Sequence, residues 1–191
     1  MTGSAEFLTK IVALLNRAGI PHMLAGSVAC IAYSGPRNTY DVDIVIHPTL
    51  PQLDALLALL KPDEFYVSAQ AAVEAFSTKT MFNVIDLETG WKADLVLLRP
   101  RPFSVEEFGR RIPATIWGVD LPIVTPEDSI ISKMEWRKDS RSERQYEDAL
   151  RIAQSVWDVL DIIYLRQWAA VLGISDDLEQ LLRDAKQLRP Q

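Results

Sequence analysis

The alternating stretch at residues 41–46, Asp-Val-Asp-Ile-Val-Ile, constrains the fold of this chain more than any other segment. Successive side chains of a β-strand point to opposite faces, so Asp41 and Asp43 project together while the aliphatic residues 42, 44 and 46 enter the core. The stretch is therefore predicted to be a strand that is buried on one face and acidic on the other. Two carboxylates placed in this way can hold a hard divalent cation.

A Gly-Ser pair, Gly26-Ser27, ends a short apolar run fourteen residues before Asp41. A turn of this kind opens a helix, whose first N–H groups and positive dipole end suit a phosphate. The same pair can act simply as a helix N-cap, and the two roles are compatible. A phosphate site next to a metal site indicates a nucleotide-handling centre.

A third acid, Asp94, interrupts the apolar run 91–98 that follows the predicted turn Glu88-Thr89-Gly90. An acid between apolar neighbours is costly to bury without a partner. If its strand pairs beside residues 41–46 with matching pleat, Asp41, Asp43 and Asp94 point into one site. Three carboxylates are enough to hold the two metal ions of a phosphoryl-transfer centre. The alternatives are a solvated strand end for the first two acids and an exposed edge position for Asp94.

The charge and composition limit the possible partners and locations. The chain has 191 residues and a formal charge of −6, which argues against broad binding to duplex nucleic acid because such binding depends on Lys and Arg. A nucleotide or one tRNA end is not excluded. We expect a cytoplasmic protein, since no apolar run is long enough to cross a bilayer, the N-terminus has no signal pattern, and the single Cys30 allows no internal disulfide.

The order of predicted elements indicates an α+β fold. Helices are predicted at 7–19, 28–33, 51–60 and 71–76, and strands at 22–25, 41–46, 65–67, 82–86 and 91–98. From Pro126 onward the pattern predicts helices only, at 126–137, 141–156, 162–172 and 176–186. We therefore expect a core at residues 1–125 and a C-terminal helical region at residues 126–191.

These motifs resemble the signature of the DNA polymerase β-like nucleotidyltransferase superfamily. The matching positions are Leu24, Gly26-Ser27, Asp41-Val42-Asp43, and Asp94 flanked by Leu95. The resemblance implies a mixed β-sheet core with flanking helices, followed by a C-terminal helical bundle. It also implies a catalytic core that uses an NTP substrate and two Mg²⁺ or Mn²⁺ ions.

A longer string is similar to a small bacterial and archaeal branch that includes abortive-infection toxin nucleotidyltransferases. The string consists of Gly26-Ser27-Val28-Ala29, Gly35, Arg37, Thr39, Asp41 and Asp43, and in the tail Thr125-Pro126-Glu127-Asp128, Lys133 and Asp148. The resemblance covers about residues 5 to 185. It implies a toxin–antitoxin or defence setting as a subsidiary hypothesis.

The resemblance gives each matching residue a role. Asp41 and Asp43 would ligate both metal ions, and Asp94 would assist the metal ion nearest the attacking hydroxyl or act as its general base. Gly26 and Ser27 would bind the β- and γ-phosphates, because glycine allows the backbone to approach and the hydroxyl of serine adds a donor. All three aspartates are thus expected to be both catalytic and metal-binding.

Three further residues are candidates for nucleotide binding. Arg37 and Thr39, just before the acids, are expected to contact the triphosphate or to fix the loop that carries it, and Arg37 can equally be a structural partner of an acid. Lys133, in the helical tail, is a candidate for neutralising a phosphate. The alternative for Lys133 is a solvated lysine on the surface of its helix.

The acceptor and the partners stay open at this point. The resemblance allows a small molecule, a protein or a tRNA as acceptor, and it allows a protein partner or a homodimer. Ala29-Cys30 stands where better-known minimal transferases often carry Arg and Gly, so the contacts that bind the triphosphate can differ. The competing hypothesis is a non-catalytic module with the same fold that senses nucleotide or binds another protein.

Overall fold

The computed structural model describes residues 2–35 and 41–188 of the chain. Arg37 and Thr39, predicted to bind nucleotide, lie outside the described residues. The chain forms two compact units. Of the described residues, the first unit contains 2–29 and 41–124, and the second contains 30–35 and 125–188.

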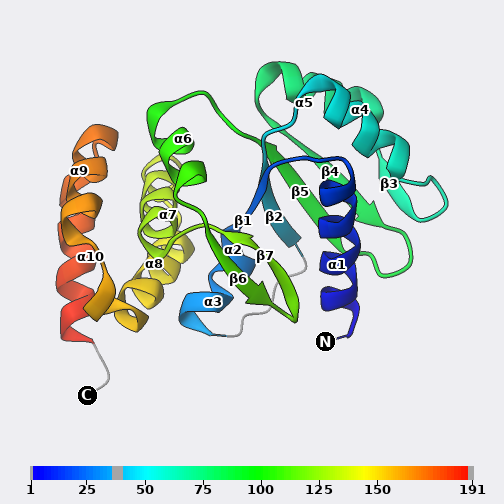
Figure 1. The fold of residues 1–191 in the computed structure, drawn as a ribbon. Coiled ribbons are helices and arrows are strands. Elements are labelled where there is room, and N and C mark those ends of the chain that lie inside the picture. The colour runs from blue at the N-terminus through cyan, green and yellow to red at the C-terminus, as the bar shows by residue number, and fades with distance from the viewer. Residues whose placement is uncertain (1, 36–40, 189–191) are drawn as a thin grey trace. The chain divides into compact units, whose positions relative to one another are not determined.

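Within the described residues, the first unit is built on a mixed seven-stranded sheet with the order β3-β4-β5-β2-β1-β7-β6 (Figure 1). The strands are β1 (His22–Ala25), β2 (Asp41–Ile46), β3 (Phe65–Val67), β4 (Met81–Asp86), β5 (Lys92–Leu97), β6 (Ile112–Ile116) and β7 (Val119–Ile123). The helices are α1 (Thr2–Arg17), α2 (Gly26–Ala29), α4 (Leu50–Leu59), α5 (Ala69–Thr78) and α6 (Pro102–Gly109). The unit thus combines helices with a sheet that contains both parallel and antiparallel strand pairs, as expected for an α+β fold.

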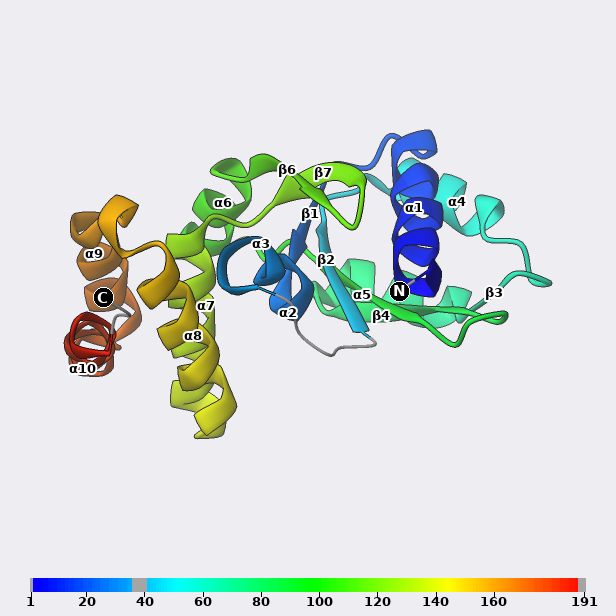
Figure 2. The ribbon, with the colours of Figure 1, turned by 90° about the horizontal axis from the view of Figure 1, so that it is seen from below.

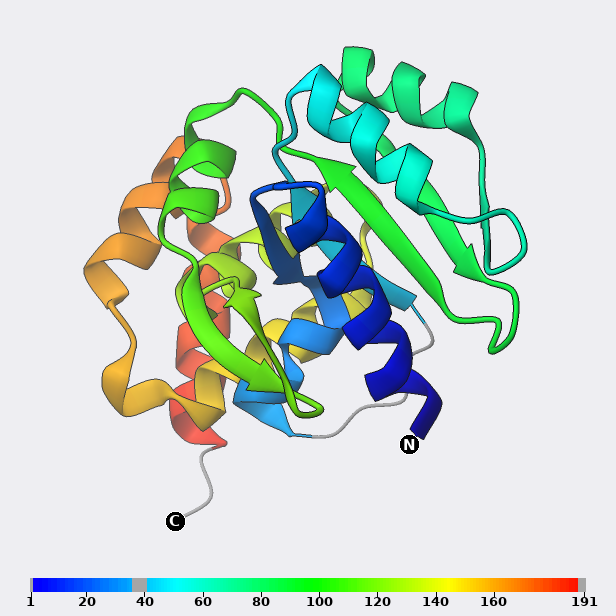
Figure 3. The ribbon, with the colours of Figure 1, turned by 45° about the vertical axis from the view of Figure 1, so that its right-hand side comes forward.

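The two central strands alternate as the sequence predicts. Val42, Ile44 and Ile46 of β2 are fully buried, and Ala93, Leu95 and Leu97 of β5 are buried beside them. Helices α1 and α4 contact each other and lie side by side in front of the sheet in Figure 3. Burial of each aliphatic side chain stabilises the fold by about 1.5–3 kcal/mol. Because these side chains must face the core, the alternate side chains of the same strands must lie on the other face of the sheet.

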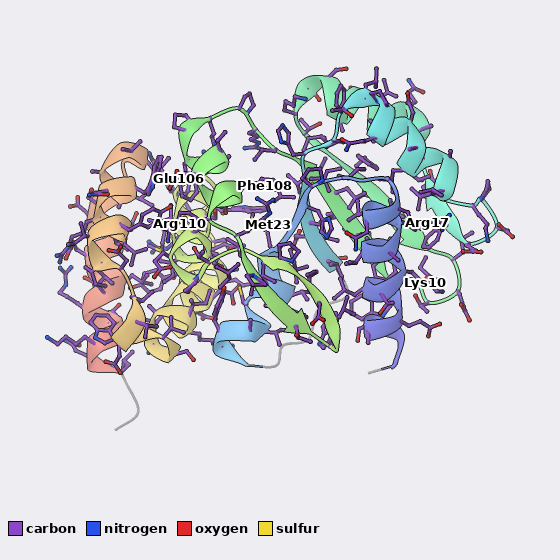
Figure 4. The ribbon with its side chains drawn as sticks, in the orientation of Figure 1. Lys10, Arg17, Met23, Glu106, Phe108 and Arg110 are labelled. Atoms are coloured by element: carbon purple, nitrogen blue, oxygen red, sulfur yellow. The ribbon has the colours of Figure 1, made fainter. Side chains whose placement is uncertain are left out.

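The hairpin between β4 and β5 is held by Asp86. Its Oδ1 accepts hydrogen bonds from the backbone N–H groups of Glu88 and Thr89, at 2.9 and 3.0 Å. Its Oδ2 lies 3.3 Å from Nζ of Lys10, which projects from α1 (Figure 4). Burial alone raises the pKa of Asp86, but the two N–H donors and Lys10 outweigh it and hold the pKa below its usual value.

We expect Asp86→Asn to lower the free energy of unfolding at pH 7 by about 1–2 kcal/mol, because the charged partner of Lys10 is lost. The pKa of Asp86 is depressed in the folded chain, so its contribution is fully present above the usual value near 3.8 and is lost as the pH falls toward the folded value. Urea unfolding at pH 7 and at pH 3 measures both effects. The variant should lose less stability on acidification than wild type, and an equal loss would contradict this account.

Residues 99–125, for which the sequence pattern predicts no element, contain α6 and the β6–β7 hairpin. The hairpin turns at Trp117 and Gly118, both with positive φ (52° and 82°), as a two-residue turn between twisted strands requires. The predicted helix at 28–33 is also divided, into α2 and α3 (Ile31–Ser34), on either side of Cys30. Short apolar runs carry too little periodicity to place such breaks.

All the secondary-structure elements described in the second unit are helices. It contains α3 and, after residue 124, α7 (Pro126–Ser140), α8 (Glu143–Ser155), η1 (Trp157–Val159), α9 (Ile162–Leu172) and α10 (Ser175–Gln187). Helix α7 packs against α8 and α9, and α10 packs against α8 and α9 (Figure 2). Thr125 caps α7 by accepting a hydrogen bond from the N–H of Asp128, and Gly173 ends α9 with a φ of +67°.

The predicted fold class is confirmed: a mixed sheet with helices is followed along the chain by helices that pack together. Among the described residues, no helix has both the length and the apolar character needed to span a membrane. The assignment of residues 1–125 as a catalytic core stays a prediction.

Candidate functional site

Parallel pairing of β2 with β5 places the predicted acids on one face of the sheet. The register sets Asp43 opposite Asp94 and Asp41 opposite Lys92. Neighbouring strands lie about 4.8 Å apart, and residues two apart in a strand share a face, so the four side chains lie at the corners of a rectangle. The side chain of Asp41 is 56% exposed and that of Asp94 14%. The structure therefore brings Asp41, Asp43 and Asp94 together, with Asp94 in the deeper position.

Lys92 joins two of these acids. Its Nζ lies 3.4 Å from Oδ1 of Asp41 and 3.1 Å from Oδ1 of Asp94. Partial burial works against the charged form of Lys92, but the hydrogen bonds and charges of both aspartates outweigh it and raise its pKa. Lys92 was not among the predicted site residues, although its position two residues before Asp94 in the same strand places it on the acidic face.

Asn83 of β4 is a second neighbour of Asp94 that the sequence did not reveal. It lies opposite Asp94 in the antiparallel β4–β5 pair, and its Nδ2 donates a hydrogen bond of 2.5 Å to Oδ1 of Asp94. Only the register between the two strands brings this amide to the carboxylate. Asp94 is thus held by one neutral and one charged donor, from two adjacent strands.

Gly26 brings the backbone against the same acids. β1 pairs antiparallel with β2, with Ala25 opposite Asp43, and α2 begins at the next residue. A Cβ atom at Gly26 would lie 1.9 Å from Oδ2 of Asp43, and its φ of +60° is a conformation that side chains rarely adopt. Ser27 follows directly and is half-buried. The predicted Gly-Ser turn therefore lies beside the acidic face, and only glycine fits its first position.

We expect Gly26→Ala to destabilise the chain by more than the 1–2 kcal/mol typical of a side chain with positive φ, because the methyl group must displace Asp43. Gly118→Ala is the matched control: its φ is +82°, and nothing lies within 4 Å of the added Cβ. Chemical denaturation measures both variants. In an Asp43→Ala background the cost of Gly26→Ala should fall but stay above that of Gly118→Ala, because the Cβ of residue 43 still lies 2.8 Å from the added methyl group, and an unchanged cost would show that the two residues are not coupled.

The carboxylates fit a divalent cation in their chemistry, but the side chains are not arranged around one. Among the described residues, no group of three His, Cys, Asp or Glu side chains is close enough together to hold a metal ion as it stands. The Lys92 ammonium occupies the space between Asp41 and Asp94, which shows that this place accepts a positive charge. Carboxylate oxygens are the ligands that Mg²⁺ and Mn²⁺ prefer, so Asp41, Asp43 and Asp94 are the residues that would hold such an ion.

Lys133 lies in the second unit, where it is buried and paired. Its Nζ is 3.1 Å from Oδ2 of Asp148, and both side chains are 7% exposed. It is thus neither a solvated lysine nor an uncompensated cation, and the alternative of a surface lysine is wrong. Its predicted contact with a phosphate stays a prediction.

We expect Lys133→Met to lower the free energy of unfolding by about 3–5 kcal/mol, because it leaves the buried Asp148 carboxylate without its partner. The control is Arg166→Met, which breaks an exposed ion pair with Glu179 in the same unit and should cost far less, because solvent screens an exposed pair. Thermal or urea unfolding compares the two. Similar costs for both variants would mean that Lys133 does not stabilise the helical unit in this way.

No protein-family model and no curated protein sequence matches the chain. Solved structures do match it. A nucleotidyltransferase-like protein from Paracoccidioides brasiliensis, described as antigenic, aligns with a TM-score of 0.58 and 19% identity over 94% of this chain and 92% of that chain. The chain has an α+β nucleotidyltransferase-like fold.

Two further structures share this fold. ANT(2'')-Ia in complex with adenylyl-2''-tobramycin gives a TM-score of 0.59 and 12% identity, covering 90% of this chain and 97% of that one. The lincosamide antibiotic adenylyltransferase LnuA with lincomycin bound gives 0.51 and 10%, covering 76% and 93%. At these identities the likeness concerns the fold alone, and the chemistry has to be argued from the acidic face itself.

Proposed function

We propose that this chain is a metal-dependent nucleotidyltransferase, which moves a nucleoside monophosphate from an NTP to an acceptor. The observation that carries the proposal is the acidic face, where Asp41, Asp43 and Asp94 are brought together by strand register beside Gly26. Three carboxylates on one side of a buried sheet are electrostatically unfavourable unless cations balance them. A site that handles Mg²⁺ and a triphosphate accounts for their proximity.

The residues of the acidic face have different roles in the proposed reaction. In the transfer, the acceptor oxygen forms a bond to the α-phosphorus, the bond from that phosphorus to the pyrophosphate oxygen breaks, and the acceptor proton goes to the Asp94 carboxylate. Asn83 holds that carboxylate in one orientation. Gly26 lets the backbone approach the phosphates, and the Ser27 hydroxyl donates a hydrogen bond to them. A divalent cation held by the aspartates supplies neutralisation of the charge that develops on the phosphates.

Among the possible acceptors, we favour a small molecule that carries a hydroxyl group. ANT(2'')-Ia and LnuA, whose structures contain adenylyl-2''-tobramycin and lincomycin, share the fold. The net charge of −6 works against an extended RNA as acceptor. ATP is accordingly the first donor to test, because LnuA is an adenylyltransferase and the ligand bound to ANT(2'')-Ia carries an adenylyl group.

The proposal is tested by binding and by turnover. Thermal-shift and calorimetric titrations with ATP, GTP, CTP and UTP, each with Mg²⁺ or Mn²⁺, should show binding of at least one nucleotide. Asp43→Asn should weaken that binding at least about tenfold, because one ligand charge is lost. Asp54→Asn, on the exposed side of α4, removes the same charge away from the acidic face and should leave binding unchanged.

Turnover distinguishes an enzyme from a sensing module. With α-labelled ATP and a panel of hydroxyl-bearing small molecules, wild type should form a labelled adduct and release pyrophosphate, and Asp94→Asn should abolish both. Nucleotide binding that needs no metal ion, with no adduct under any condition, would support the non-catalytic alternative. No response to any NTP would contradict the proposed function altogether.

A further inference from the structure

Lys92 contacts two of the carboxylates that would hold a metal ion. Its ammonium group lies within 3.4 Å of Asp41 and 3.1 Å of Asp94, two of the three residues that the proposed function assigns as metal ligands. A lysine ammonium and a divalent cation both bind carboxylate oxygens at short range, so they compete for the same atoms. A carboxylate oxygen that binds a metal ion is less available to Lys92. Binding of a metal ion to Asp41 and Asp94 therefore weakens the contacts of both aspartates with Lys92.

The two aspartates differ in what else holds them. Asp94 is 14% exposed and also accepts the hydrogen bond from Asn83, so it keeps an anchor when Lys92 moves. Asp41 is 56% exposed and lies at the first position of β2. The Lys92 side chain itself is 33% exposed, so it has room to turn toward solvent without opening the core. The Lys92 side chain can therefore move away from the two aspartates while β2 and β5 stay in register.

We propose that Lys92 is a positioning residue: in the metal-free chain its ammonium group holds Asp41 and Asp94 together, and it is released when a divalent cation binds. This inference rests on the proposed function. Lys92 stabilises the closely spaced carboxylates before the substrate complex arrives, and it lowers the affinity for a metal ion that comes without nucleotide. It is not a catalytic residue, because it acts through the aspartates.

The first test is the affinity for Mn²⁺ alone, measured by calorimetry or by the electron paramagnetic resonance signal of free Mn²⁺. We expect Lys92→Met to bind Mn²⁺ at least about fivefold more tightly than wild type, because no ammonium has to be displaced. Without metal the variant should unfold at a lower temperature than wild type. Lys92→Gln, which removes the charge but keeps a hydrogen-bond donor, gives the same comparison if Lys92→Met does not fold.

Lys10→Met is the matched control for net charge. Lys10 has the same side-chain exposure as Lys92, 33%, and also bridges two carboxylates, Asp86 and Glu88. Strand alternation places Asp86 on the face of β4 opposite to Asn83, so this pair belongs to the other side of the sheet. Its removal should leave the Mn²⁺ affinity unchanged. An increase equal to that of Lys92→Met would show a general charge effect and overturn the proposal.

The second test follows the release of Lys92 directly in wild type. An amine-reactive acetylating reagent and peptide mass spectrometry measure the labelling rate of each lysine with and without Mg²⁺. We expect Mg²⁺ to accelerate labelling of Lys92 several-fold and to leave Lys10 unchanged. Asp43→Asn should suppress the acceleration. Labelling of Lys92 that stays constant or slows when the metal binds would overturn the proposal.

The outcomes separate this inference from the proposed function. If Asp43→Asn abolishes Mn²⁺ binding but Lys92→Met leaves it unchanged or weakens it, the role of Lys92 is wrong and the metal site stands. If neither wild type nor any variant binds Mn²⁺, with or without ATP, the proposed function fails and the release of Lys92 fails with it.

Discussion

The parallel pairing of β2 with β5 is the interaction on which the first unit depends. One register aligns two buried aliphatic rows, Val42, Ile44 and Ile46 with Ala93, Leu95 and Leu97, and the same register sets Asp43 beside Asp94. A slip by one residue would turn both sets to the wrong faces. The apolar side of the sheet therefore determines the geometry of its acidic side.

Carboxylates gathered in this way repel one another, and the surrounding residues show how the fold tolerates them. Lys92 supplies a positive charge between Asp41 and Asp94, and Asn83 donates a hydrogen bond to Asp94. At Gly26 the fold uses a glycine with positive φ to bring the backbone against Asp43. The acidic face is thus only partly compensated without a metal ion, and a metal ion that binds there has to compete with Lys92 for the carboxylate oxygens.

In the second unit, buried charged groups are also compensated by neighbouring side chains. Its buried charges are paired internally: Lys133 with Asp148, and Asp128 with the hydroxyl groups of Thr125 and Tyr164. A buried ion pair contributes little net stability over apolar packing, yet loss of either partner is strongly destabilising. These contacts explain why Lys133, which the sequence pattern allows to be a surface lysine, is buried and paired within the helical unit.

Local sequence patterns are enough to predict the strand at 41–46, the acidic face of that strand, the Gly-Ser turn and the third acid, because period-two alternation and glycine are local signals. They leave residues 99–125 unassigned, and they give no sign of Asn83 or of the pairing of Lys133. Those depend on which strands and helices become neighbours, and many pairings satisfy the same local pattern. Only the tertiary structure decided that Asp94 lies opposite Asp43 and that Lys92 lies between the carboxylates, because burial of the aliphatic rows selects one register.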